Sequence, residues 1–335
     1  MRGDHLNLPS VDVIVPCYRY GHFLEECVRS VVSQEGVSVR VLIIDDASPD
    51  HTAEVGRELQ DQDPRVTFRR HAENLRHIAT YNEGIDWIAS SYYLLLSADD
   101  YLVPGALRRA TELMETDETI GFTFGQAFEL SDRELKRVWI PFADDTSRRI
   151  MSGREFIDIS GAKNLVPTPT AVIRTELQKR VGGYRPELPH SGDMEMWLRL
   201  AAHANVGFVN EVQAVYRKHA DNMSRSYNAD WLPDVRQRKL ALEHFFSHNR
   251  SALAGGEALR AKVFSALAKE AISFASAAFN RGESATMESF IEIALDLSPG
   301  VKKSPEWRKL SLKRLLGRPA WDSLQKMIMC FGWGR

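Results

Sequence analysis

The stretch VRVLIIDDASPD, residues 39–50, decides the fold class of this sequence. The mostly apolar run from Val39 to Ile44 is typical of a buried strand. This run stops abruptly at Asp45 and Asp46, and Ser48-Pro49-Asp50 then favours a turn and a helix start. The stretch therefore predicts a buried strand that carries two carboxylates at its carboxyl end.

The neighbouring segments repeat this pattern. Val11 to Val15 and Tyr92 to Leu96 predict two more strands, and the second of these ends at Ser97-Ala98-Asp99-Asp100. Apolar residues at helical spacing separate the strands, which is typical of a mainly parallel α/β sheet. Ligands of such sheets bind beyond the carboxyl ends of the strands, so acids at two strand ends predict a binding crevice.

Later segments predict a mixture of elements. Alternating apolar residues over 120–128 indicate a half-buried strand, residues 131–152 resemble a loop, and 206–215 resembles a pair of strands. Ser152-Gly153 favours a helix start, and Trp197 is expected to anchor the core. From about residue 240 to 297 the pattern predicts a helical hairpin.

The C-terminal stretch combines basic and apolar residues at helical spacing. Only Glu306 opposes the cations Lys302, Lys303, Arg308, Lys309, Lys313, Arg314 and Arg318. Apolar residues follow at Trp321, Leu324, Met327 and Ile328. Such a helix either lies on an anionic leaflet, in peripheral contact with a membrane, or docks on the α/β domain, and the sequence slightly favours docking.

Composition limits the possible functions. The 335 residues suggest about two domains, which we expect at 8–235 (α/β) and 236–335 (helical). A net charge of −2 argues against a global attraction to nucleic acid or to an anionic membrane, so any such attraction must be local, and nucleic acid is not expected as a partner. The three cysteines show no paired spacing, which favours a cytoplasmic protein. The polar N-terminus argues against a signal peptide, and the lack of long apolar runs argues against a membrane span.

The motifs of several common enzyme classes are absent: G-x-G-x-x-G, the G-K-[ST] phosphate loop, H-E-x-x-H and G-x-S-x-G. The remaining candidates for chemistry are the acids at the strand ends together with His219. Carboxylate and imidazole suit a divalent cation.

Six segments in order resemble family 2 glycosyltransferases with the GT-A fold. They begin at Val11, Val41, Asn74, Leu94, Gly192 and Tyr216, and read VDVIVPCYRYGHFLEECVRSVVSQ, VLIIDDASPDHT, NLRHIATYNEGI, LLLSADDYLVPGAL, GDMEMWLRLA and YRKHADNMS. The resemblance covers about residues 11–225 and leaves the helical tail uncovered. It implies a GT-A (Rossmann-like) α/β fold, with a mixed, mainly parallel sheet flanked by helices and an all-α C-terminal region.

By this resemblance, Asp46, with Asp45 beside it, would accept the imide N–H of uracil. Tyr18 would stack on the base and Arg76 would contact the nucleotide. Two alternatives stay open: the aspartates could merely cap the following turn, and Tyr18 could belong to the core.

The resemblance also implies a metal site. Asp99 would be the principal ligand of Mn²⁺ or Mg²⁺ and would bind the donor through it, with Asp100 beside it and His219 returning to the metal or diphosphate. The family's Asp-x-Asp pattern is incomplete, because its first position is Ser97. Alternatively, Asp99 and Asp100 could begin a helix, and His219 could be structural.

Asp193 matches the family's catalytic base, which takes the proton of an acceptor hydroxyl. Glu195 lies about 200° further round a helix, so both acids would not face one site. A plain helix N-cap is the alternative for Asp193.

The resemblance thus implies an inverting transfer from a nucleotide-sugar, with UDP as the expected nucleotide, to a saccharide or lipid-linked hydroxyl acceptor. Synthesis of a cell-surface polysaccharide or glycoconjugate is the expected setting, in the cytoplasm or peripherally at the inner face of the plasma membrane. An inactive nucleotide-sugar-binding module and a sugar nucleotidyltransferase are the rival interpretations.

Overall fold

The computed structural model describes residues 8–131, 133–138, 140–141, 147–220, 222, 231–253 and 255–323. The chain divides into two compact units, one up to residue 222 and one from residue 223 onward. The predicted boundary at 235/236 falls within helix α9 (Trp231–His248) of the second unit. The extent of the catalytic domain itself stays a prediction.

The first unit is built on one mixed sheet with the order β3-β2-β1-β4-β9-β6-β10-β5. Its first half is parallel, as predicted, and consists of β1 (Ser10–Cys17), β2 (Ser38–Asp45), β3 (Val66–Arg70) and β4 (Tyr92–Leu95). The register pairs Cys17 with Asp45, so β1 and β2 end side by side. The α/β prediction is confirmed.

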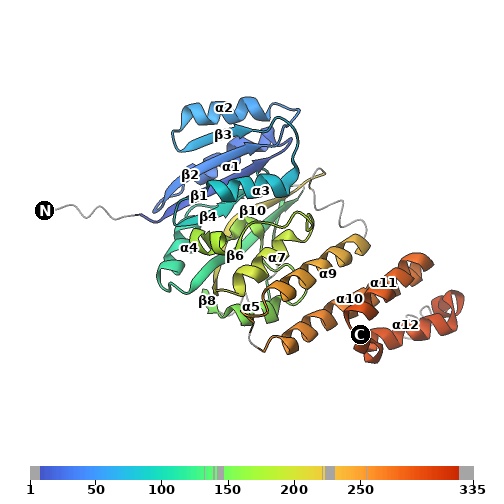
Figure 1. Cartoon of the computed structure of the whole chain (residues 1–335). Helices are drawn as coiled ribbons and strands as arrows, with labels where there is room; N and C mark the ends of the chain where they lie inside the picture. Colours follow the sequence, from blue (N-terminus) through green and yellow to red (C-terminus); the bar gives the residue numbers. More distant parts are fainter. Residues whose placement is uncertain are drawn as a thin grey trace. The chain divides into compact units, whose positions relative to one another are not determined.

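Helices connect the parallel strands (Figure 1). They are α1 (Gly21–Val32), α2 (Thr52–Gln62), α3 (Arg76–Trp87) and α4 (Ala106–Glu115). The apolar face predicted for the first of these is buried, since Leu24, Cys27, Val28 and Val31 are inaccessible to water. Gly84 lets α3 approach the sheet closely, because a Cβ there would lie 2.3 Å from a methyl group of Ile14.

The second half of the sheet is more irregular. It contains β5 (Tyr101–Leu102), β6 (Ile120–Ser131), β7 (Glu134–Arg137), β8 (Arg148–Met151), β9 (Val172–Arg174) and β10 (Asn205–Lys218). β6 is buried on both faces from residue 120 to 127, so the half-buried prediction is wrong. β10 is one long strand that bulges near Val209 and Val212, not a pair. β7 and β8 lie in the segment expected to be a loop.

Three helices and a short 3₁₀ turn complete this unit: α5 (Gly153–Ser160), η1 (Thr168–Thr170), α6 (Thr175–Val181) and α7 (Gly192–Ala201). The predicted start of α5 is confirmed, since the Ser152 hydroxyl caps it by accepting from the Glu155 N–H at 3.2 Å. Trp197 is buried and stacks on Phe122, which confirms its place in the core.

The second unit is helical in its described part, which includes the predicted hairpin. Its elements are α9, α10 (Glu257–Arg281), α11 (Ser284–Leu297), η2 (Pro299–Lys303) and α12 (Pro305–Leu316). Leu324, Met327 and Ile328 of the predicted tail lie outside the described residues. In the described part of the chain, every helix is too short or too polar to cross a bilayer.

Candidate active site

The predicted site residues gather at one edge of the sheet. β1, β2 and β4 end there together. The short strand β9 is antiparallel to both β4 and β6, so β6 runs in the same direction as β4. Because β10 is parallel to β6, it ends at the same edge. This topology brings His219, the residue after β10, to the turn that holds Asp99. Four separate segments of sequence thus end at the same edge of the sheet.

Asp45 and Asp46 have different hydrogen-bond partners. One oxygen of the buried Asp45 carboxylate accepts from the Ser48 N–H at 2.9 Å, so Asp45 does cap the turn, as the alternative interpretation expected. Asp46 instead accepts at Oδ1 from the Leu75 N–H and lies 2.8 Å from Nδ1 of His71. Its Oδ2 makes no hydrogen bond to any described residue and is left to receive a donor group.

His71 bridges two carboxylates at this place. Its second nitrogen, Nε2, lies 2.7 Å from Oε2 of Glu83. Burial alone would lower the pKa of His71, but its hydrogen bonds to Asp46 and Glu83 outweigh burial and raise the pKa. His71 thereby fixes the orientation of the Asp46 carboxylate.

Hydrogen bonds bring Tyr18 and Arg76 to Asp46. The Asp46 N–H donates to the carbonyl of Cys17, the residue before Tyr18, and Arg76 directly follows Leu75. Tyr18 is 42% exposed, so the core alternative is wrong for it. The Arg76 side chain is exposed as well. Both side chains are free to meet a ligand beside Asp46.

The backbone around Asp46 adopts unusual conformations. Arg19, Ala47 and Arg76 have φ values of 65°, 56° and 67°, a left-handed region that side chains with a Cβ seldom occupy. Among the described non-glycine residues, only Arg133 shares this property. Three of these four strained residues therefore surround one pair of aspartates.

Asp99 lies at the centre of a second cluster. Its Oδ2 is 3.1 Å from Nε2 of His219 and accepts from the side-chain amide of Asn222 at 3.0 Å. Its Oδ1 is buried and has no hydrogen-bond partner among the described residues. The helix-start alternative is wrong for this turn, because α4 begins only at Ala106.

Asp100 is tied to the end of β10. Its Oδ1 accepts from the Arg217 N–H at 2.9 Å, and the Arg217 guanidinium donates to the Asp99 carbonyl at 2.7 Å. Burial, reinforced by the adjacent charge of Asp99, raises the pKa of Asp100 well above its ordinary value. Such a buried pair of acids calls for a compensating positive charge.

A divalent cation fits this cluster by its chemistry. Oδ1 of Asp99 is a carboxylate oxygen without a partner among the described residues, and the imidazole of His219 contacts the other oxygen of the same carboxylate. Within the described ranges, however, no three His, Cys, Asp or Glu side chains are grouped closely enough to hold a metal alone. The protein would therefore supply only part of a coordination shell.

Asp193 lies in the first turn of α7. The helix begins at Gly192 and its N-cap residue is Ser191, so the N-cap alternative is wrong for Asp193. Its Oδ2 accepts from the Thr168 hydroxyl at 3.0 Å, and the Tyr184 hydroxyl donates to the same carboxylate. Burial raises the pKa of Asp193, although these two hydrogen bonds partly oppose that effect.

Glu195 forms ion pairs away from Asp193, as expected from its position on the helix. Its carboxylate pairs with Arg185 at 3.1 Å and with Arg199 at 2.9 Å, and it is fully buried. Two guanidinium groups thus neutralise Glu195, which leaves Asp193 as the acidic residue of α7 that can act as a general base.

Tyr81 of α3 connects the two acidic clusters. Its ring packs edge-on against Tyr184, with 5.3 Å between the ring centroids. Burial raises the pKa of Tyr81 well above its ordinary value, and the nearby charges of Asp193, Asp99 and Asp100 add to the shift. The phenol therefore lies within electrostatic reach of both the predicted base and the predicted metal ligands.

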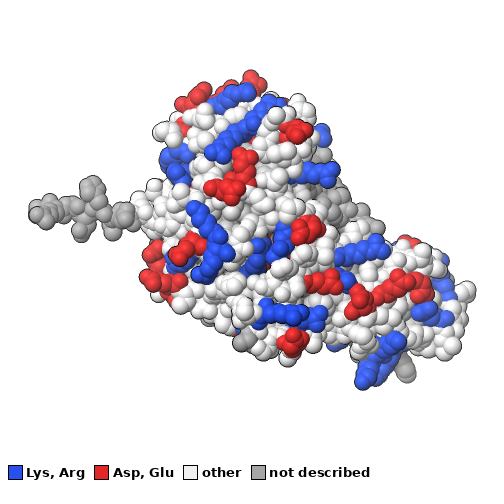
Figure 2. All heavy atoms as spheres, in the orientation of Figure 1, with Lys and Arg blue, Asp and Glu red and all other residues white. Residues whose placement is uncertain are grey.

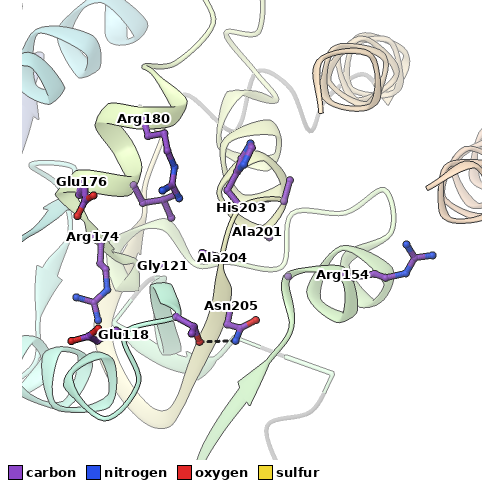
Figure 3. A pocket seen from close by; sticks show the side chains of 14 residues that line it. Glu118, Gly121, Arg154, Arg174, Glu176, Arg180, Ala201, His203, Ala204 and Asn205 are labelled. Carbon is purple, nitrogen blue, oxygen red and sulfur yellow. Dashed lines mark hydrogen bonds between the residues drawn. The ribbon is translucent and has the colours of Figure 1, made fainter. Parts of the chain in front are cut away.

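A cavity of 620 Å³ lies at the opposite edge of the sheet (Figure 3). It is lined where β6 and β10 begin, and where α7 ends, by residues that include Glu176, Arg180 and His203. The Arg174 guanidinium, which also lines it, donates to the carbonyls of Ile120 and Met114. The lining contains none of the predicted site residues, so the size of this cavity does not point to the chemistry.

Sequence reasoning missed several residues of the site. Asn222 falls inside the quoted segment YRKHADNMS, yet the amide was overlooked beside the more conspicuous His219. Arg217 gives no sequence signal of its role, because it binds Asp100 through its backbone N–H and Asp99 through that residue's backbone carbonyl. Thr168 and Tyr184 contact Asp193 from distant segments, and nothing in their local sequence signals it.

The mixed sheet, with acids at its strand ends, has the α/β arrangement of the GT-A fold. Residues 12–171, just under half of the chain, match Glycosyl transferase family 2, so this stretch is a domain of that family. This match contradicts the nucleotidyltransferase interpretation and identifies the protein as a glycosyltransferase.

Relatives and solved structures agree with this assignment. The hyaluronan synthase of Pasteurella multocida is 30% identical over 230 residues, which is 66% of this chain and 22% of that protein. The fold is similar to that of S. aureus TarS in complex with UDP-GlcNAc (TM-score 0.60, 13% identity, 88% of this chain and 92% of that one). It is also similar to the mannosyltransferase PcManGT from Pyrobaculum calidifontis with GDP-Man and Mn²⁺ (TM-score 0.53, 17% identity, 97% and 86%).

Proposed function

We propose that this glycosyltransferase transfers a sugar from a UDP-sugar to a hydroxyl group of a saccharide or lipid-linked acceptor, with inversion at the anomeric carbon. The observation that carries the proposal is the pair of acidic clusters that both lie within electrostatic reach of Tyr81. One cluster, at Asp99, suits the diphosphate end of a donor, and the other, at Asp193, suits an acceptor hydroxyl.

The nucleotide would bind at Asp46. The free Oδ2 of this carboxylate would accept the imide N–H of uracil, while Leu75 and His71 hold Oδ1 in place. The exposed ring of Tyr18 would stack on the base, and Arg76 would contact the nucleotide. Asp45 would act beside them, mainly by fixing the turn.

The diphosphate would lie against Asp99, Asp100 and His219, which would hold Mn²⁺ or Mg²⁺. When bound, such a cation neutralises charge on the departing diphosphate. Asn222 and the Arg217 N–H would keep the two carboxylates in place. Because these residues form an incomplete shell, oxygens of the donor would complete it.

Asp193 would act as the general base. It would accept the proton of the acceptor hydroxyl as that oxygen forms a bond to the anomeric carbon. The bond from this carbon to the diphosphate breaks on the opposite face, and the diphosphate leaves with the electron pair. The raised pKa of Asp193 makes its carboxylate a stronger base than an ordinary aspartate.

The setting we propose is synthesis of a cell-surface polysaccharide or glycoconjugate in the cytoplasm. The similarity to a hyaluronan synthase supports a polysaccharide product. The two described cysteines, Cys17 and Cys27, are free and buried, which suits a reducing compartment.

The test is a panel of UDP-, GDP- and dTDP-sugars with Mn²⁺ or Mg²⁺, followed by calorimetry and by slow donor hydrolysis. We expect one UDP-sugar to bind only with metal, and hydrolysis to be lost in Asp193→Asn but kept in Glu176→Gln. The second variant makes the same carboxyl-to-amide change in the cavity at the opposite edge. Loss of activity in Glu176→Gln alone, or no metal-dependent binding of any donor, would overturn the proposal.

A further inference from the structure

Helix α12 is fixed to its own unit by one face. Leu310 is buried there, and the ammonium of Lys313 donates to the Ser276 hydroxyl at 2.7 Å and to the Asn280 side chain at 2.8 Å. Burial lowers the pKa of Lys313. Lys313 therefore acts as an anchor to α10, although its sequence context suggested a surface cation.

The opposite face of α12 carries leucines in contact with water. Leu312, Leu315 and Leu316 are 46%, 84% and 40% exposed. Arg308, Leu312 and Leu315 recur at intervals of four and three residues, so they share one side of the helix. An 84% exposed leucine on an ordered helix gains nothing from folding.

Exposed cations lie on α12 beside these leucines and in η2 just before the helix. Lys302, Lys303, Arg308 and Lys309 are exposed, and none forms an ion pair with another described residue. By contrast, Arg314 on the flank of the same helix pairs with Glu288 at 2.9 Å. The described surface thus combines three exposed leucines with four uncompensated positive charges, which we call the α12 outer face. Elsewhere, basic and acidic side chains are interspersed on the visible surface of the protein (Figure 2).

We propose that the α12 outer face binds the surface of an anionic lipid bilayer. The leucines would enter the boundary between head groups and acyl chains, and the four cations would lie among the anionic head groups. A nucleic acid would use the cations but not the leucines. A second protein chain would need acidic side chains around an apolar groove. This inference does not depend on the proposed sugar transfer.

Sedimentation of the full chain with phosphatidylcholine vesicles, with and without phosphatidylglycerol, tests the inference in the absence of any donor. We expect binding only when phosphatidylglycerol is present. Binding should fall about tenfold or more between about 0.1 M and 1 M salt, because the Debye length shrinks from about 10 Å to about 3 Å. Equal binding to neutral vesicles would overturn the proposal.

Double substitutions test which residues of the α12 outer face bind the bilayer. Leu312→Ser with Leu315→Ser, and separately Arg308→Gln with Lys309→Gln, should each reduce binding about tenfold or more at low salt. The matched control is Lys163→Gln with Arg250→Gln, which removes two exposed cations elsewhere and should bind as the unaltered protein does. Thermal unfolding by circular dichroism shows whether each variant keeps its fold.

Three outcomes would contradict the inference. Full binding by the leucine variant, with loss in the arginine–lysine variant, would make the surface a general polyanion site. Equal loss in the control would show that net charge alone matters. Loss of binding after deletion of residues 324–335, with the α12 outer face intact, would place the lipid contact outside α12.

Discussion

The imidazole Nε2 of His219 lies 3.1 Å from Oδ2 of Asp99, although 120 residues separate the two in sequence. The contact exists because β10 ends beside the turn that follows β4. It leaves the other oxygen of Asp99 buried and without a partner among the described residues. The two residues that the proposed function assigns to one cation are thus already placed together.

This arrangement predicts that metal-dependent binding of the nucleotide rests on Asp99. In Asp99→Ala we expect Mn²⁺ to have no effect on UDP affinity in calorimetry, while His219→Ala should weaken the effect about 10- to 100-fold. Asn222→Asp tests whether the Asn222 amide positions the Asp99 carboxylate, since the variant keeps the size of the side chain but adds a charge. An unchanged metal titration in Asp99→Ala would move the metal elsewhere.

Tyr18 should contribute to affinity without contributing to stability. Its exposed ring has room to stack on a base, so Tyr18→Ala should weaken UDP binding about tenfold or more. Tyr18→Phe keeps the ring and serves as the control, with near-normal affinity. Both variants should unfold at the temperature of the unaltered protein. A drop in that temperature in Tyr18→Ala would instead assign Tyr18 to the fold.

Asp193→Asn should separate binding from turnover. We expect donor affinity to stay within about twofold and sugar transfer to fall about 100-fold or more, as for loss of a general base. Because burial raises the pKa of Asp193 in the folded state, its contribution to stability is present below the pKa of the unfolded chain and lost as pH rises through the folded pKa. Asp193→Asn should therefore raise the unfolding temperature at neutral pH but not in acid.

Tyr184→Phe should move the pH dependence of transfer. The reaction needs ionised Asp193, so its rate rises with pH through the pKa of that carboxyl. The hydrogen bond from Tyr184 lowers this pKa, hence its removal should shift the acid limb of the rate profile to higher pH. A lower rate with an unmoved limb would mean that Tyr184 only shapes the site.

Gly153→Ala should disrupt the packing of α5 on α7. A Cβ at this position would lie 1.6 Å from the carbonyl oxygen of Ala201, so the helices would have to separate. We expect the free energy of unfolding to fall by about 3 kcal/mol or more in denaturant titrations. Gly300→Ala, whose Cβ meets nothing closer than 3.7 Å, should change it little.

Local sequence was enough to predict the elements with strong periodicity. The apolar runs that end in aspartates placed Asp45, Asp46, Asp99 and Asp100 at strand ends, because strand direction and burial are encoded within a few residues. The same rules failed for β7 and β8, since β7 and most of β8 lack a buried face whose pattern could be recognised. β10 was divided in two because its bulges interrupt the alternation.

The environment of the site could not be predicted in the same way. Whether an aspartate caps a turn or faces a ligand depends on which backbone groups reach it. The Ser48 N–H of the following turn binds Asp45, whereas the Leu75 N–H, at the start of α3, binds Asp46. Likewise, the two hydroxyls at Asp193 come from a 3₁₀ turn and a loop that only the tertiary fold brings together. Contacts over such sequence distances leave no local pattern.

The left-handed residues Arg19, Ala47 and Arg76 have a practical consequence for engineering. Glycine is the residue best suited to each position, so a library selected only for resistance to heat should accumulate glycine at these three sites. At Arg76 such a change would also remove a side chain that we assign to the nucleotide. Heat selection should therefore retain activity as a second criterion, because the easiest gains in stability lie beside Asp46.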